Sequence, residues 1–224
     1  MRSYLYLLIA FSAAAHAAPP ARVEIAYEMT RNGMPLADIT HRFAHGGGSY
    51  QVTETWRGRG LFALRGSIKR SSHGAVTDVG LRPLEYSDER TGRDTERARF
   101  DWTAKTVTLQ FDSEPKTIPL PPHAHDRLAF FYEFAFNPPR GREVALDVID
   151  GRGVSDQVYR IEGNERLTLP AGDFDTVRLV RRKESGERAE LYLARDRDYL
   201  PVRLLVIDKN GTRLDQVATR ISGE

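Results

Sequence analysis

A short histidine-containing segment is the part of the chain whose residue types and spacing best suit metal chemistry. His123 and His125 stand two residues apart, and Asp126 follows directly. Two imidazoles and a carboxylate could supply three ligands to zinc. The alternative, which we favour, is that Asp126 caps a helix while both histidines lie on an exposed, proline-flanked loop. We therefore expect no bound metal and no cofactor.

Other arrangements of catalytic residues are not visible in the sequence. No serine lies in the G-x-S-x-G motif that presents a nucleophile in hydrolases, and the chain has no cysteine. The triple glycine at 46–48 lacks the lysine of a phosphate-binding loop and indicates a turn. None of the 31 acidic residues stands out as a pair for glycoside hydrolysis. We expect a protein that is not an enzyme.

Aromatic side chains form the most prominent set of candidate binding residues. If they leave space between a helix and a sheet, they line a cavity for an apolar small molecule or a lipid. If they fill that space, they form an ordinary core, and the sequence does not decide between the two. The candidate lining residues are Trp56, Phe62, Trp102, Phe111, Phe130, Phe131, Tyr132 and Phe134.

Four of these aromatic residues belong to one apolar segment, 125–136, which is predicted to be a helix. Leu128, Phe131, Tyr132 and Ala135 recur at helical spacing. The remaining positions are largely apolar as well, so the helix should be buried on nearly all sides. Two prolines after residue 137 end it. Such a helix needs a concave apolar partner, and the inner face of a curved sheet would supply one.

Alternation of apolar and polar residues dominates the rest of the chain and predicts roughly a dozen strands. We therefore expect an all-β fold, namely a curved antiparallel sheet or an incomplete β-barrel with one buried apolar helix. No linker-like stretch divides the chain. The predicted strands cover residues 22–29, 36–43, 50–57, 61–68, 76–86, 93–102, 105–112, 142–149, 157–161, 166–169, 174–182, 188–193, 200–208 and 212–221.

The first seventeen residues have the layout of a secretory signal peptide. Arg2 supplies a positive start, residues 4–11 are apolar, and Ala15-His16-Ala17 is a small-x-small cleavage signal. The apolar run is too short for a bilayer, which takes about 20 residues. We expect a cleaved signal peptide over 1–17 and a single β-rich periplasmic domain over 18–224.

Composition excludes several classes of partner. Lys and Arg total 33 and Asp and Glu total 31, so loss of Arg2 with the leader leaves a net charge of +1 (32 − 31). This balance is too close to neutral for a general nucleic-acid binder. Absence of cysteine excludes disulfides and a lipid anchor on cysteine. No later segment reaches membrane-span length.

Several segments carry motifs that resemble a known family. They lie at 81–86 (LRPLEY), 126–132 (DRLAFFY), 169–179 (LPAGDFDTVRL), 191–196 (LYLARD) and 199–204 (YLPVRL). In this order and spacing they resemble the family called domain of unknown function 3108, a set of secreted or periplasmic bacterial proteins. Tyr192 stands where the family pattern has tryptophan and Ala129 where it has serine, and both departures suit packing positions. The resemblance implies an all-β, barrel-like envelope protein and supplies no catalytic residues.

Two hypotheses for function follow. The first is a non-catalytic periplasmic binder or carrier of a lipid-like or other apolar ligand, held by burial of apolar surface. The second is an envelope assembly or scaffold protein that binds a partner chain through a sheet edge. A third, which we consider weaker, is a metal-dependent hydrolase that uses His123 and His125.

Overall fold

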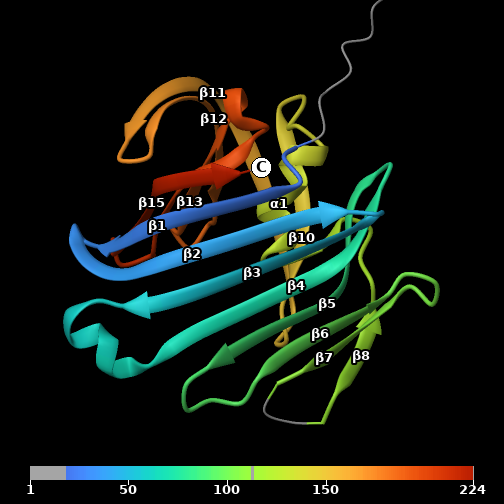
Figure 1. Ribbon diagram of the computed structural model, residues 1–224. Coiled ribbons are helices and arrows are strands. Elements are labelled where there is room, and N and C mark those ends of the chain that lie inside the picture. Colours follow the sequence, from blue (N-terminus) through green and yellow to red (C-terminus); the bar gives the residue numbers. More distant parts are fainter. Residues whose placement is uncertain (1–18, 112–113, 224) are drawn as a thin grey trace, which may run out of the picture.

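The structure is a computed structural model that describes residues 19–111 and 114–223. Within these residues, fifteen strands form a single sheet that curls around one α-helix (Figure 1). Strand order across the sheet is β8-β7-β6-β5-β4-β3-β2-β1-β15-β14-β13-β12-β11-β10-β9. The β9–β10 pair is parallel and the other neighbouring pairs are antiparallel. The predicted all-β class, with a curved open sheet and one buried helix, is confirmed.

The elements have the following bounds. The first eight strands are β1 (Arg22–Arg31), β2 (Met34–Gly46), β3 (Ser49–Gly58), β4 (Ser67–Thr77), β5 (Gly80–Arg90), β6 (Glu96–Asp101), β7 (Thr106–Gln110) and β8 (Lys116–Pro119). The others are β9 (Ala124–Asp126), β10 (Glu143–Ile149), β11 (Val154–Leu169), β12 (Gly172–Arg182), β13 (Arg188–Ala194), β14 (Leu200–Ile207) and β15 (Arg213–Gly223). The helix is α1 (Ala129–Phe136), and two 3-10 turns are η1 (Gly60–Arg65) and η2 (Arg195–Arg197).

Each half of the chain builds its side of the sheet from successive hairpins. Tight turns join the first strands, with positive φ at Asn32 (51°) and Gly33 (81°), and again at Gly47 (57°) and Gly48 (76°). Asn and Gly tolerate this left-handed backbone, which suits the twist of a hairpin. The two halves meet in the middle of the sheet, where β1 pairs with β15.

The two ends of the sheet approach each other without pairing. β9 packs near β5, and the turn between β10 and β11 presses against β6 and β7. At Gly151 a Cβ would lie 2.6 Å from the backbone nitrogen of Arg97 and 2.8 Å from the carbonyl oxygen of Gln110, so only glycine fits. Arg152 pairs with Glu96 at 2.7 Å. The sheet is therefore a nearly closed barrel around α1.

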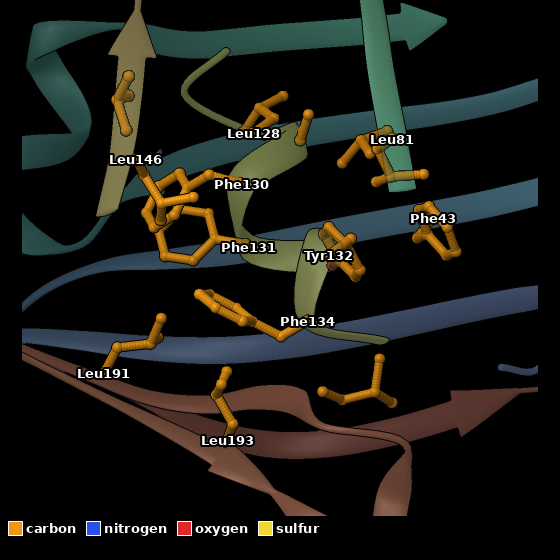
Figure 2. Packing of buried hydrophobic residues seen from close by; sticks show 14 of the residues in the cluster. Phe43, Leu81, Leu128, Phe130, Phe131, Tyr132, Phe134, Leu146, Leu191 and Leu193 are labelled. Carbon is orange, nitrogen blue, oxygen red and sulfur yellow. The ribbon is translucent and has the colours of Figure 1, made fainter. Parts of the chain in front are cut away.

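The helix is held by packing rather than by its own helical propensity. All of its residues except the last are buried, and an eight-residue helix is marginal on its own in water. Tyr132 faces Phe43 and Leu81, whereas Phe134 faces Leu193 on the opposite wall (Figure 2). Burial of each large side chain contributes about 1.5–3 kcal/mol. The curved sheet supplies the concave apolar partner that the sequence predicts.

The start of the helix differs from the prediction. Residues 124–126 form β9, and α1 begins at Ala129. The carboxylate of Asp126 accepts hydrogen bonds from the backbone N–H groups of Leu128 (2.7 Å) and Ala129 (2.8 Å). Asp126 therefore caps the start of the helix, as predicted, but it does so from an extended strand that ends three residues before Ala129.

Some strand predictions also need correction. Of the predicted strand 61–68, only residues 67 and 68 belong to a strand, because positive φ at Gly60 (54°) and Gly66 (82°) bends the preceding chain into η1. The segment 76–86 is two strands, because the turn at 78–79 separates the end of β4 from β5. The short strand β8 was not expected, and β11 joins two predicted strands across an irregularity in register.

Candidate functional site

Four of the eight candidate aromatic residues pack inside the core: Phe130, Phe131, Tyr132 and Phe134. The ring centroids of Phe130 and Phe131 are 4.0 Å apart, and the ring of Tyr132 stacks on Phe43 at 4.6 Å. All four are at most 9% exposed. Their side chains therefore fill space between helix and sheet at these positions.

The other four are distributed over separate pockets, one of which Phe134 also lines. Trp56 and Phe62 line a pocket of about 370 Å³ beside η1. Phe111 borders a pocket where the guanidinium of Arg152 lies 4.1 Å from its ring centroid. Trp102 and Phe134 line a pocket of about 440 Å³ beside α1. The structure does not bring the eight side chains together around one space.

The pocket that contains Trp102 and Phe134 lies where the two ends of the sheet meet, and we call it the seam pocket. It is bounded by β5, β9, the second half of α1, the segment after it and β10. Its lining residues are Val79, Leu81, Arg82, Trp102, Pro122, His123, Ala124, His125, Glu133, Phe134, Asn137, Pro138, Pro139, Arg140, Glu143, Val144, Ala145 and Leu146. At about 440 Å³ it is within the size range of small-molecule sites.

Both histidines of the predicted metal motif line the seam pocket, but they do not share an environment. His123 is exposed, whereas His125 lies in β9 with 12% of its side chain exposed. The predicted exposed loop is therefore wrong for His125, because the parallel pairing of β9 with β10 draws it into the seam. Within residues 19–111 and 114–223, no group of three or more histidine, cysteine or acidic side chains is arranged to hold a metal.

A buried glutamate lies beside His125 in the pocket. Burial raises the pKa of Glu133 to about 7 by penalising its charged form. Hydrogen bonds from Asn137 and from the backbone N–H of Leu81 (2.7 Å) favour the carboxylate and limit this rise. Near neutral pH, Glu133 therefore exists in both charged and neutral forms.

His125 provides a polar atom without a partner. Burial and the charge of His123 lower the pKa of His125 to about 4, so its ring is neutral at pH 7. Its Nδ1 is 4.0 Å from Oε2 of Glu133, which is too long for a hydrogen bond. This buried nitrogen has no hydrogen-bond partner in the part of the chain that the structure describes. A buried polar atom in this state costs about 1–3 kcal/mol unless something bonds to it.

The rim of the seam pocket combines an aromatic ring with positive charge. The indole N–H of Trp102 donates to the carbonyl oxygen of Pro83 at 2.6 Å, which fixes the ring. The guanidinium of Arg82 lies 5.3 Å from the centre of that ring. Arg140 is exposed at the same pocket. The arrangement offers apolar walls, a polar floor and guanidinium groups at the mouth.

A comparison of the sequence with models of known protein families shows to which family this chain belongs. The family described as "Protein of unknown function (DUF3108)" matches residues 26–217. The chain belongs to the DUF3108 family. The family resemblance predicted from the motifs is therefore confirmed.

Solved structures support the same fold for this DUF3108 chain. A β-barrel-like protein of domain of unknown function DUF1849 from Brucella abortus is 9% identical, with 93% of this chain and 100% of that chain covered and a TM-score of 0.59. A protein from Parabacteroides distasonis is 12% identical, with 91% and 97% covered and a TM-score of 0.42. The first of these likenesses supports a barrel-like fold. A comparison with curated proteins finds no match.

The motifs of the DUF3108 chain lie mainly at turns and packing positions. Pro170 and Ala171 form the turn between β11 and β12. Tyr192 and Ala129, the two departures from the family pattern, are 4% and 0% exposed. Tyr27 donates its hydroxyl hydrogen to the carbonyl oxygen of Pro201 at 2.7 Å. These residues build the interior in which α1 lies.

One set of residues in this DUF3108 chain was missed by sequence reasoning. Five neighbouring strands, β2 to β6, each place an ionisable residue at facing positions on the inner wall: His41, Glu54, Arg70, Asp88 and Glu96. We call these residues the charge row. Each is at most 5% exposed.

Ion pairs and hydrogen bonds run along most of the charge row. Nε2 of His41 lies 2.8 Å from Glu54, and the Nε–H of Arg70 donates to Asp88 at 2.7 Å. Arg70 also pairs with Glu54 through Nη1. Although burial would raise the pKa of Glu54, the hydrogen bond and charge of His41 and the charge of Arg70 hold it at about 2. Glu54 is therefore ionised throughout the physiological range.

The signal for the charge row lies only in the strand register. In the sequence, each member is a single ionisable residue among the inward positions of its own strand. Only when β2 to β6 are aligned does Glu54 face His41 and Arg70, and Arg70 face Asp88. Glu96, at the end of the row, pairs with Arg152 of the turn between β10 and β11. Because each member has a partner, we interpret the row as structural.

A second buried polar group ties the helix to the sheet. Ser72 on β4 donates to Asp126, and the hydroxyl of Tyr50 lies 3.0 Å from that of Ser72. Burial raises the pKa of Asp126 to about 6, against the hydrogen bonds from Ser72, Ala129 and Leu128 that lower it. The start of α1 is thereby attached to the wall next to the charge row.

Proposed function

We propose that this protein is a non-catalytic binding protein that works in the periplasm, and that the seam pocket holds a small ligand with an apolar body and an acidic group. The observation that carries the proposal is the unpartnered Nδ1 of His125 on the floor of a pocket of about 440 Å³. Binding sites pair apolar walls with a few polar groups that orient the ligand.

The pocket chemistry indicates how such a ligand would bind. A hydroxyl or carboxyl oxygen can bridge Nδ1 of His125 and Oε2 of Glu133, which are 4.0 Å apart. Trp102 and Leu146 offer apolar surface for the body of the ligand. The guanidinium of Arg82 at the mouth attracts an acidic group.

The residue types favour binding over catalysis. Among the described residues that line the pocket there is no serine, threonine, cysteine, tyrosine or lysine. His125 therefore has no hydroxyl, thiol or amine nucleophile beside it to activate. The periplasmic location rests on the leader at 1–17, which lies outside the described residues. No described helix is long and apolar enough to cross a membrane.

The edge-binding hypothesis has less support. The edge strand β8 has four residues. It ends in Pro119 and follows Pro115, and proline has no backbone N–H to donate to an added strand. We therefore favour the pocket.

The test is titration with a fluorescent fatty acid, 11-(dansylamino)undecanoic acid. We expect saturable binding at one site, with enhanced dansyl emission. Val144→Trp fills the pocket and should weaken binding at least tenfold, since Val144 lines it. Val158→Trp is the matched control, because Val158 is on the neighbouring strand at 43% exposure and outside the pocket lining.

A second variant separates a binding role from a structural one. His125→Phe removes the unpartnered nitrogen, so the folded state should be no less stable in urea, while probe affinity should fall roughly tenfold. Absence of probe binding to the native protein, or equal binding to Val144→Trp, would refute the proposal. A large loss of stability in His125→Phe would mean that the nitrogen serves the fold.

A further inference from the structure

The turn between β3 and β4 exposes two leucines at its tip. Leu61 and Leu64 in η1 are 84% and 85% exposed. The turn projects at one corner of the sheet, away from the barrel interior (Figure 1). Large apolar side chains this exposed are usually scattered singly, whereas these two lie three residues apart in one turn.

Contacts at the base of the turn fix its backbone so that the two leucine side chains point outward. Phe62, between them, is half-buried and lines a pocket with Trp56. The backbone N–H of Arg59 donates to Leu36 (2.9 Å), and that of Phe62 donates to Arg59 (3.0 Å). At Gly58 a Cβ would collide with the backbone of Phe62. Phe62 thus points inward as an anchor.

The chain around the tip is basic. No acidic residue occurs from 55 to 77, while this stretch contains Arg57, Arg59, Arg65 and Lys69 around the turn. Arg57 and Lys69 are exposed. Arg59 pairs with acidic residues of the neighbouring strands, and facing acidic residues also lie opposite Arg57 and Lys69. Along the sequence, the turn and its flanks at 57–69 therefore combine apolar and basic residues with no acidic one.

We propose that this tip, residues 57–69, docks the protein on a lipid bilayer that contains anionic lipids. Apolar side chains flanked by Arg and Lys insert at the boundary of head groups and acyl chains, and each basic residue near an anionic surface adds to the attraction. A six-residue turn is far smaller than the roughly 800 Å² per partner of a stable protein interface. A bilayer needs no such area, since it deforms around a narrow tip.

Docking at this tip is independent of the seam pocket. The tip joins β3 to β4, whereas the pocket borders the turn at the other end of β4. A protein docked through η1 would therefore keep the pocket away from the bilayer surface. The proposal does not require that the pocket bind anything.

The test is flotation of the mature protein with vesicles of phosphatidylethanolamine and phosphatidylglycerol, compared with vesicles of phosphatidylcholine. We expect binding to the anionic vesicles that weakens in high salt. The double variant Leu61→Ser, Leu64→Ser should bind them at least roughly tenfold less. The control is Val154→Ser, Val158→Ser, which removes exposed apolar residues elsewhere (42% and 43%) and should bind as the native protein does.

Three outcomes would overturn the proposal. The first would be that the native protein fails to float with anionic vesicles, and the second that the leucine variant floats equally well. The third would be a dimer in sedimentation that the leucine substitutions convert to monomer, because the tip would then bind a second copy of the chain. Circular dichroism of each variant establishes that it is folded. Val144→Trp, which blocks the seam pocket, should float normally and so keeps this test separate from the proposed function.

Discussion

Replacement of Arg70 by methionine tests whether the charge row stabilises the folded protein. Arg70 is 5% exposed and pairs with both Glu54 and Asp88. Methionine keeps an unbranched apolar side chain but removes the cation that Glu54 and Asp88 share, which leaves Glu54 with His41 and Asp88 with Arg90. Removal of one partner from a buried ion pair typically costs about 3–5 kcal/mol. We expect a loss of this size in the free energy of unfolding, measured by urea denaturation at pH 7. Domain stabilities are about 5–15 kcal/mol in total.

The pH dependence of this loss gives the sharper test. In the native protein the pKa of Glu54, about 2, lies below its usual 4.5. Its contribution is therefore present above about pH 4.5 and is lost as the pH falls toward 2. In Arg70→Met the pKa of Glu54 should lie higher than in the native protein, because burial still penalises the charged form and only His41 remains to stabilise it. The variant therefore loses less of this contribution on acidification, and the difference in unfolding free energy between variant and native protein should shrink as the pH falls below about 4.5.

Arg90→Met is the matched control. Arg90 also pairs with Asp88, but its side chain is 26% exposed, so its loss should cost about 1 kcal/mol or less. A difference below about 1 kcal/mol for Arg70→Met, or one that stays constant as the pH falls below about 4.5, would refute the interpretation of the row as a buried ion network.

Three further predictions concern the helix and the seam. Asp126→Ala removes the acceptor for two backbone amides and for Ser72, so unfolding free energy should fall by about 2–4 kcal/mol in urea, and Asp126→Asn should lose less. The pKa of Glu133, about 7, lies above its usual 4.5, so its contribution to stability declines as the pH rises from about 4.5 through 7. Glu133→Gln should gain stability relative to the native protein between pH 5 and pH 8, by roughly 2–3 kcal/mol, and a pH-independent difference would contradict this. Gly151→Ala forces a Cβ against the backbone of β6 and β7 and should lower the thermal midpoint at a cost of about 1–3 kcal/mol, whereas Gly153→Ala, in open space, should not.

Alternation and turn residues predict most of the fold because they are local signals. The hairpin of β14 and β15 and the pairing of β12 with β13 follow from period two and the turns between them. The failures occur where a local pattern is overridden. Gly60 and Gly66 turn an apolar run into η1. At Asp126 a side-chain cap allows a strand to be followed by the helix after a turn of only two residues.

The candidate site was only partly predictable, since it depends on contacts between distant segments. The sequence identifies Trp102, His123 and His125 as unusual, but not that β5, β9 and β10 gather them into one pocket with Glu133. Glu133 lies within an apolar helix and resembles an isolated solvent-facing position in the sequence. The close approach of the two ends of the sheet, which no periodicity encodes, places Glu133 in the pocket.

The pairing of β1 with β15 has a consequence for how the molecule is assembled in time. Val23 faces Gly223, about two hundred residues away along the chain, while most other strand pairs join neighbours. Each half can form hairpins as soon as it is available, but each then carries one unpaired central edge. Because closure between remote segments is slow, these two edges stay open until residues 213–223 are free to pair. Until then the chain consists of two separate half-sheets. The unpaired edge of β1 must therefore be kept from pairing with other chains while the protein folds.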